Sequence, residues 1–147
     1  CFPGVPHRLE LIRQLDGVAW FNDSKATNYD AAEVALKALQ GPLVVLAGGE
    51  AKQGDADGWI DGLQREARAV VLFGAARETF QELLQRGAYD GAIHTVEGLS
   101  EAVPLARRIA AERNCRAVLL SPACASFDQY RDFEARGEHF RQLVQSL

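Results

Sequence analysis

The sequence predicts a three-layer α/β fold, in which helices cover both faces of a doubly wound, mostly parallel sheet of about six strands. The first observation behind this prediction is that short apolar runs alternate with helix-like amphipathic segments from residue 40 onward in the 147-residue chain. Such alternation is typical of parallel strands joined by right-handed helical crossovers. The second is Asp16-Gly17, which lies between two apolar runs and favours a two-residue hairpin turn. The N-terminal strand is therefore expected to be antiparallel.

Composition narrows the class of protein. Hydrophobic residues make up 48% and charged residues 24% of the chain, as in a soluble globular domain. The net charge of -4 argues against a nucleic-acid surface, which needs clustered Lys and Arg. No apolar run approaches the roughly 20 residues of a membrane span. Three cysteines without paired spacing indicate neither a disulfide framework nor a zinc site, so we expect a cytoplasmic protein without a metal site.

The beginning of the chain predicts a linker followed by one domain. Two prolines and a glycine within residues 1–8 disfavour a helix and suit an extended linker. Residues 9–147 then form a single domain, whose first two strands are expected at 9–12 and 18–21. Because the chain lacks Met and begins abruptly, we interpret it as a fragment of a longer protein.

The remaining elements follow from the apolar pattern. A helix over 29–39 has Thr27 or Asn28 as its N-cap and ends at Gly41-Pro42. Continuous apolar runs predict strands at 43–47, 69–73, 92–96 and 117–120. Segments with one apolar face predict helices at 58–65, 76–85, 100–113 and 130–146.

Two details of these helices can be tested. Pro104 is expected in the first turn of its helix, where a missing N–H costs little. Four charged residues of the last helix are interpreted as its solvated face: Glu134, Arg136, Glu138 and Arg141.

Three polar loops follow predicted strands, at 22–28, 48–55 and 121–129. In open α/β sheets, ligands bind at such strand-to-helix turns. The glycines of the second loop would let backbone N–H groups approach a ligand closely. Two ammonium groups and three hydroxyls would suit an anionic small molecule: Lys25, Lys52, Ser24, Thr27 and Ser126. The alternative at this stage is that the three loops are unrelated.

Other motifs are absent or weak. Neither a P-loop nor a G-x-G-x-x-G motif follows a strand, so the domain is not expected to cradle a triphosphate by itself. Cys124 is interpreted as a buried small residue, His94 as a core or edge residue and His139 as a surface group. His7-Arg8 is expected to be an exposed linker pair, unless a neighbouring domain meets this one there.

Five motifs occur in a specific order and spacing: Pro6-His7-Arg8-Leu9-Glu10, Asn22-Asp23-Ser24-Lys25-Ala26-Thr27-Asn28, Gly48-Gly49-x-x-Lys52, Ser121-Pro122-Ala123-Cys124-Ala125-Ser126-Phe127-Asp128-Gln129 and Phe133-Glu134-x-Arg136-Gly137-x-x-Phe140. Together they resemble the C-terminal domain of the Mur ligase family, whose sheet is Rossmann-like. Within that family they are most similar to the members that add D-glutamate during peptidoglycan synthesis. The resemblance covers essentially the whole chain.

The resemblance implies an ATP-dependent ligase of three domains, of which only the amino-acid-binding domain is present here. The carboxylate of UDP-N-acetylmuramoyl-L-alanine would take the γ-phosphoryl group of ATP, and the amine of D-glutamate would attack the acyl phosphate. ATP and Mg²⁺ would be bound mainly by the missing central domain, which is also the expected partner of this domain within a monomer. The fragment alone is expected to be inactive.

The resemblance also assigns roles to single residues. Four would bind D-glutamate: Lys52, Thr27, Ser126 and Phe133. Lys25 and His7 would be the catalytic residues. Lys25 would reach the transferred phosphate and would also help to bind D-glutamate, and His7 would lie near the reacting groups at the domain junction. Arg8 and Asp23 would contact the nucleotide.

The chain departs from the family pattern at Glu50-Ala51, where Asp-Gly is expected, and at Phe127, which is often Leu; neither change removes a charged contact. Two alternatives remain at this stage. One is a free-standing module that binds a small anion or a nucleotide, and the other is a ligase of the same family that adds a different amino acid.

Overall fold

The structure is a computed structural model that describes residues 7–50 and 54–147. Most of the predicted linker and Lys52 therefore lie outside the described residues. The elements in chain order are β1 Glu10–Leu15, β2 Val18–Asn22, α1 Tyr29–Ala38, β3 Leu43–Gly48, α2 Asp57–Glu66, β4 Ala67–Phe73, α3 Arg77–Arg86, β5 Ala92–Thr95, α4 Leu99–Glu112, β6 Ala117–Leu120 and α5 Phe133–Gln145.

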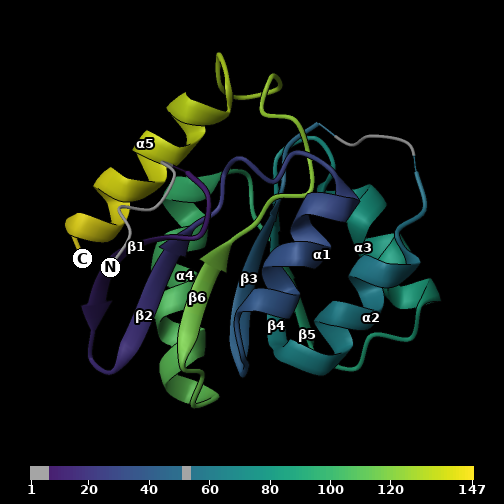
Figure 1. Ribbon diagram of the computed structural model, residues 1–147, viewed down its shortest axis with the longest axis horizontal. Helices are drawn as coiled ribbons and strands as arrows, with labels where there is room; N and C mark the ends of the chain where they lie inside the picture. Colours follow the sequence, from purple (N-terminus) through teal and green to yellow (C-terminus); the bar gives the residue numbers. More distant parts are fainter. Residues whose placement is uncertain (1–6, 51–53) are drawn as a thin grey trace.

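The six strands form one sheet in the order β1-β2-β6-β3-β4-β5 (Figure 1). Only β1 and β2 pair antiparallel, and the other neighbours are parallel. Asp16 and Gly17 both have positive φ, 54° and 78°, as a tight hairpin turn between right-twisted strands requires. The predicted sheet and its antiparallel N-terminal strand are therefore confirmed.

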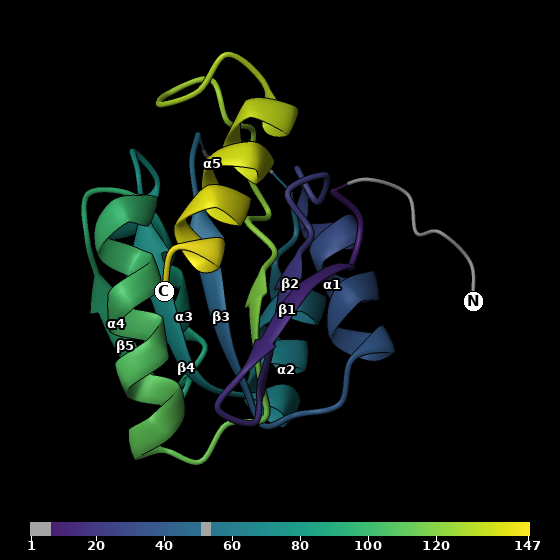
Figure 2. The same ribbon diagram turned by 90° about the vertical axis from the view of Figure 1, so that its left-hand side faces the viewer.

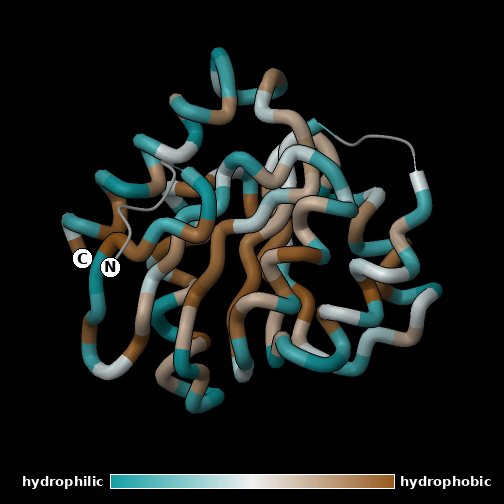
Figure 3. The backbone as a smooth tube through the Cα atoms, viewed as in Figure 1, coloured by the Kyte–Doolittle hydropathy of each residue, from teal (hydrophilic) through white to brown (hydrophobic). Residues whose placement is uncertain are grey.

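Helices cover both faces of the sheet. One core cluster joins α1, α2 and α3 to one face of the central strands, and a second joins α4 and α5 to the opposite face. Figure 2 shows α1 and α4 on opposite sides of the strands, and Figure 3 shows hydrophobic residues concentrated along the central strands. All six residues of β3 are buried, because helices cover both of its sides. The three-layer prediction is confirmed.

Two helix details were predicted wrongly. The last helix starts at Phe133 and not at residue 130, because Asp132 is its N-cap and accepts a hydrogen bond from the Ala135 N–H at 2.7 Å. Pro104 lies in the second turn of α4, since that helix begins at Leu99. The carbonyl of Ser100, which a residue with an N–H at position 104 would bind, belongs to an exposed residue. Solvent can therefore hydrate it.

The first helix begins as predicted. Asn28 is the N-cap of α1, and its side-chain oxygen accepts a hydrogen bond from the Ala31 N–H. Within the described residues, no helix is both long and apolar enough to cross a membrane.

Candidate functional site

The carboxyl ends of the parallel strands lie along one edge of the sheet, at the top of Figure 1. All three polar loops leave the sheet there. The first loop continues directly from β2, and the Asp23 N–H donates to the Leu120 carbonyl at 2.7 Å. The loop after β6 therefore begins beside the loop after β2.

Arg136 of α5 joins these two loops from within. Its Nε donates to the Ser24 hydroxyl at 2.9 Å and its Nη2 to the Ser24 carbonyl at 2.8 Å, while Nη1 donates to the Cys124 carbonyl at 3.0 Å. The Ser24 hydroxyl in turn donates to the Phe133 carbonyl at 2.7 Å. Ser24 and Cys124 thus share one buried guanidinium, which brings the first and third loops together.

The interpretation of Arg136 as part of a solvated face was wrong, since its side chain is 0% exposed. The Arg136 guanidinium is largely removed from water, and this burial lowers its pKa to about 10. It remains charged at neutral pH, although its three hydrogen-bond partners are neutral oxygens. Nearby negative charge, including that of Asp128 in the third loop, partly opposes this lowering of its pKa, and the guanidinium can still favour an anion in the adjoining loops.

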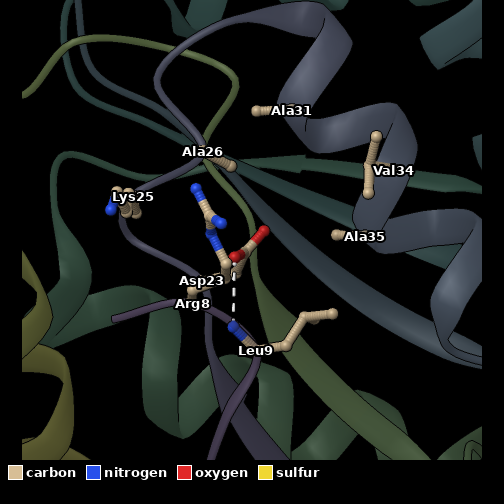
Figure 4. A pocket seen from close by; sticks show the side chains of 8 residues that line it. All are labelled: Arg8, Leu9, Asp23, Lys25, Ala26, Ala31, Val34 and Ala35. Carbon is tan, nitrogen blue, oxygen red and sulfur yellow. Dashed lines mark hydrogen bonds between the residues drawn. The ribbon is translucent and has the colours of Figure 1, made fainter. Parts of the chain in front are cut away.

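Asp23 borders a cavity of about 290 Å³ on the α1 side of the first loop. Figure 4 shows the residues that line it: Arg8, Leu9, Asp23, Lys25, Ala26, Ala31, Val34 and Ala35. The Asp23 carboxylate accepts hydrogen bonds from the Leu9 N–H at 3.1 Å and the Ser121 hydroxyl at 3.2 Å. Burial raises the pKa of Asp23 to about 6, and the positive charge of Arg8 partly opposes that rise.

His7 is 7% exposed, so the interpretation of His7-Arg8 as an exposed pair fails for the histidine, while Arg8 is exposed. The Asn22 amide oxygen accepts from the Ser24 N–H at 3.1 Å, so its NH₂ group faces His7 Nδ1 at 3.0 Å. Nδ1 must then accept, and the ring proton lies on Nε2, which is 3.9 Å from Glu138. The His7 ring is also packed edge-on against Phe133.

The second loop uses its glycines differently from the prediction. The N–H groups of Gly48 and Gly49 donate to the carbonyls of Pro122 and Phe73, so they are not free for a ligand. A Cβ on Gly49 would lie 2.3 Å from the Ala125 carbonyl oxygen. Gly48 and Gly49 thus permit close approach of protein backbone and not of a ligand. Lys52, the cation predicted for this loop, lies outside the described residues.

Ser126 is in the third loop and is only 2% exposed. Its carbonyl accepts from the N–H groups of Gln129 and Tyr130, at 3.1 Å and 2.8 Å. Its hydroxyl makes no hydrogen bond with the rest of the described chain, so it can bind a ligand.

Lys25 and Thr27 are half-buried in the first loop. Among residues 7–50 and 54–147, no group of three His, Cys, Asp or Glu could hold a metal ion.

Sequence reasoning missed Arg136 and Asn22. Arg136 had a detectable signal, because it lies three residues after Phe133 and four before Phe140, on the apolar stripe of the helix. Of the other histidines, His94 lies on the edge strand β5, in agreement with its prediction. His139 is half-buried and its Nδ1 lies 2.6 Å from the Tyr130 hydroxyl, so it is not a simple surface group.

The model of a protein family described as "Mur ligase, glutamate ligase domain" matches residues 7–124 of this chain. The chain belongs to the Mur ligase family. A Mur ligase of Prochlorococcus marinus strain MIT 9313, a UDP-N-acetylmuramoylalanine--D-glutamate ligase, is 57% identical over 99% of this chain. A ligase of the same name from Synechococcus sp. strain CC9605 is also 57% identical over 99% of the chain. The chain spans 32% of the length of each relative.

Solved structures show the same Mur ligase fold. Folylpolyglutamate synthase of Mycobacterium tuberculosis, complexed with ADP, superposes with a TM-score of 0.66 at 19% identity, over 95% of this chain and 32% of that one. The UDP-N-acetylmuramate-alanine ligase MurC of Thermotoga maritima gives a TM-score of 0.58 at 17% identity, over 99% of this chain and 31% of that one. At these identities the likeness concerns the fold alone.

Proposed function

We propose that residues 9–147 are the amino-acid-binding domain of an ATP-dependent ligase that adds D-glutamate to UDP-N-acetylmuramoyl-L-alanine. Residues 1–8 would link it to a central ATP-binding domain. The observation that carries the proposal is that Arg136 holds Ser24 and Cys124 together, so that two of the three polar loops meet beside a buried cation whose hydrogen-bond partners are neutral oxygens. The names of the relatives point to the same reaction.

D-glutamate brings two carboxylates, which need cations and oriented donors. Lys52, Thr27 and the free hydroxyl of Ser126 would supply them. Phe133 would contribute its backbone N–H, because its carbonyl is already bonded to Ser24 and the first N–H groups of α5 have no partner within the helix. The buried charge of Arg136 would favour both carboxylates from below the loops.

The cavity beside Asp23 fits a nucleoside. The Asp23 carboxylate can accept from sugar hydroxyls, Arg8 can approach phosphates, and Ala31, Val34 and Ala35 offer an apolar wall. ATP would supply the phosphoryl group that activates the acceptor carboxylate, and the residues described here do not fit Mg²⁺, which the central domain would hold. Lys25 lines the same cavity and lies in the first loop, so its ammonium would stabilise negative charge on the transferred phosphoryl group.

For His7 we propose a positioning role at the domain junction, in place of the catalytic role that the resemblance implies. Its carbonyl accepts from the Lys25 N–H at 3.0 Å, so the end of the linker is bonded directly to the first loop. Because of this bond, a movement of the neighbouring domain would displace the linker and, with it, Lys25. The His7 ring itself is held under α5 by Asn22.

The test is an amino-acid panel with the full-length protein that carries this domain. It is incubated with ATP, Mg²⁺, UDP-N-acetylmuramoyl-L-alanine and one amino acid, and phosphate release and product mass are measured. We expect product with D-glutamate and none with L-glutamate, glycine, L-alanine or L-lysine. Product with a different amino acid would reassign the substrate, and the absence of amide product with all of them would overturn the proposal.

A further inference from the structure

The loop between β6 and α5, residues 121–132, crosses the sheet edge and contacts the loops of three other strands in sheet order. The Ala125 carbonyl accepts from the Glu50 N–H, after β3, at 2.8 Å. The Asp128 carboxylate accepts from the Ala75 N–H, after β4, at 2.9 Å. The Gln129 amide donates to the Glu97 carbonyl, after β5, at 2.6 Å. Ser126 lies between the first and second of these contacts.

The contact of Asp128 with the turn after β4 is close and specific. A Cβ on Gly74 would lie 2.6 Å from the Asp128 carboxylate and 3.1 Å from the Gly49 nitrogen, so three loops approach one another at this glycine. The turn leads into α3, whose N-cap Ala76 has no side-chain hydrogen bond. A carboxylate from a distant loop therefore lies at a helix N-terminus, where negative charge is favoured.

Gln129 makes the last of the three contacts between the loop 121–132 and the sheet edge. The Glu97 carbonyl that it binds also accepts from the Gly74 N–H at 3.1 Å. One carbonyl oxygen thus joins the loops after β4, β5 and β6. Neither contact is needed to bury the core, because Asp128 and Gln129 are both exposed.

We propose that Asp128 and Gln129 are positioning residues for the amino-acid site, because they fix the loop segment that presents the Ser126 hydroxyl. The inference rests on the proposed function, in which Ser126 binds the incoming amino acid. Loss of either contact would remove one of the bonds that attach the segment after Ser126 to the sheet edge, while the bond of Ala125 to Glu50 and that of Cys124 to Arg136 remain. A small displacement of a binding group lowers the productive population of the site.

The test compares Michaelis constants in the full-length ligase. Asp128→Ala and Gln129→Ala are each expected to raise the KM for D-glutamate about five- to tenfold, with the KM for ATP unchanged within about twofold. Asp128→Asn keeps an oxygen that can accept from Ala75 and is expected to retain most of the wild-type affinity. Arg131→Ala is the matched control, because its side chain is 87% exposed in the same loop and, among residues 7–50 and 54–147, pairs only with neighbouring Asp132.

The outcomes separate this inference from the proposed function. If the wild type uses D-glutamate and both alanine variants keep its KM, the positioning role is overturned and the function stands. An equal rise in the KM for D-glutamate and the KM for ATP would also overturn the positioning role, since a general loss of structure would affect both substrates alike. If the wild type uses another amino acid, the same comparison is made with that substrate. Should Asp128→Ala fail to fold, Gln129→Ala decides.

Discussion

Asp23 is a buried carboxylate whose burial opposes stability and indicates a role in binding. Its side chain is 4% exposed, yet it has no cation within ion-pair distance in the described parts of the chain. Two neutral donors, the Leu9 N–H and the Ser121 hydroxyl, only partly replace the lost water. Burial therefore raises its pKa from 3.8 to about 6. A carboxylate that is buried with only two neutral donors indicates that Asp23 has a role in binding.

This shift predicts a pH dependence of stability. The folded state binds the proton of Asp23 more tightly than the unfolded state, so the stability that protonation contributes is full below pH 3.8 and is lost as the pH rises through about 6. Relative to Asp23→Asn, which does not titrate, the wild type should lose about 2 kcal/mol of unfolding free energy between about pH 4.5 and pH 7. Urea unfolding of both proteins across this range measures the difference. A difference that stays constant with pH would contradict the burial argument.

The residue scale is also where sequence reasoning was least complete. The hydroxyls of the first and third loops and the ammonium group of the first were identified because these loops follow strands. The two strands are neighbours in the sheet, so the loops lie close together. The partners of Arg136 could not be identified, because Ser24 lies 112 residues away and only the packing of α5 brings the two into contact. Its burial was predictable, since it follows the period of Phe133 and Phe140. The roles in binding assigned to single residues stay predictions.

At the scale of elements, the docking of α5 depends on one glycine. A Cβ on Gly137 would lie 2.1 Å from His7 Nδ1 and 3.0 Å from the Asn22 amide nitrogen. The His7 ring is buried and held by Asn22, so it cannot move aside freely. Gly137 therefore allows α5 to lie directly against the end of the linker and the end of β2.

Gly137→Ala is accordingly expected to destabilise the chain by about 1–3 kcal/mol through overpacking. Intrinsic helix propensity alone predicts the opposite, a gain of about 1 kcal/mol. The midpoint and slope of urea unfolding give the value. The double variant with His7→Ala, which removes the ring, should lose less stability than the sum of the single variants. A stabilising effect of Gly137→Ala would show that α5 does not pack against His7.

Elements were predicted better than their ends. Continuous apolar runs identified the buried strands, because a strand covered on both faces has no polar side. The start of α5 was misplaced because the polar residues before it include several possible caps, and only the contact of Asp132 with Ala135 decides between them. The insertion of β6 between β2 and β3 could not be inferred, since alternation of strands and helices leaves strand order open.

At the scale of the molecule, the sheet edge separates two kinds of site. The cavity beside Asp23 lies against α1 and has an apolar wall, and Ser126 is not among the residues that line it. The third loop lies beyond the first loop and reaches the loops after β3, β4 and β5. We therefore propose that the nucleotide binds on the α1 side and the amino acid at the loops above the central strands, with Lys25 between them.

The most direct test of this division is one set of Michaelis constants, measured for ATP and D-glutamate in the full-length protein that carries this domain and in two of its variants. Ser126→Ala removes one hydroxyl and is expected to raise the KM for D-glutamate about tenfold or more while leaving that for ATP within about twofold. Asp23→Asn should show the reverse pattern. If Ser126→Ala raised only the KM for ATP, or if neither variant changed either constant, the assignment of the two substrates to these two sites would be contradicted.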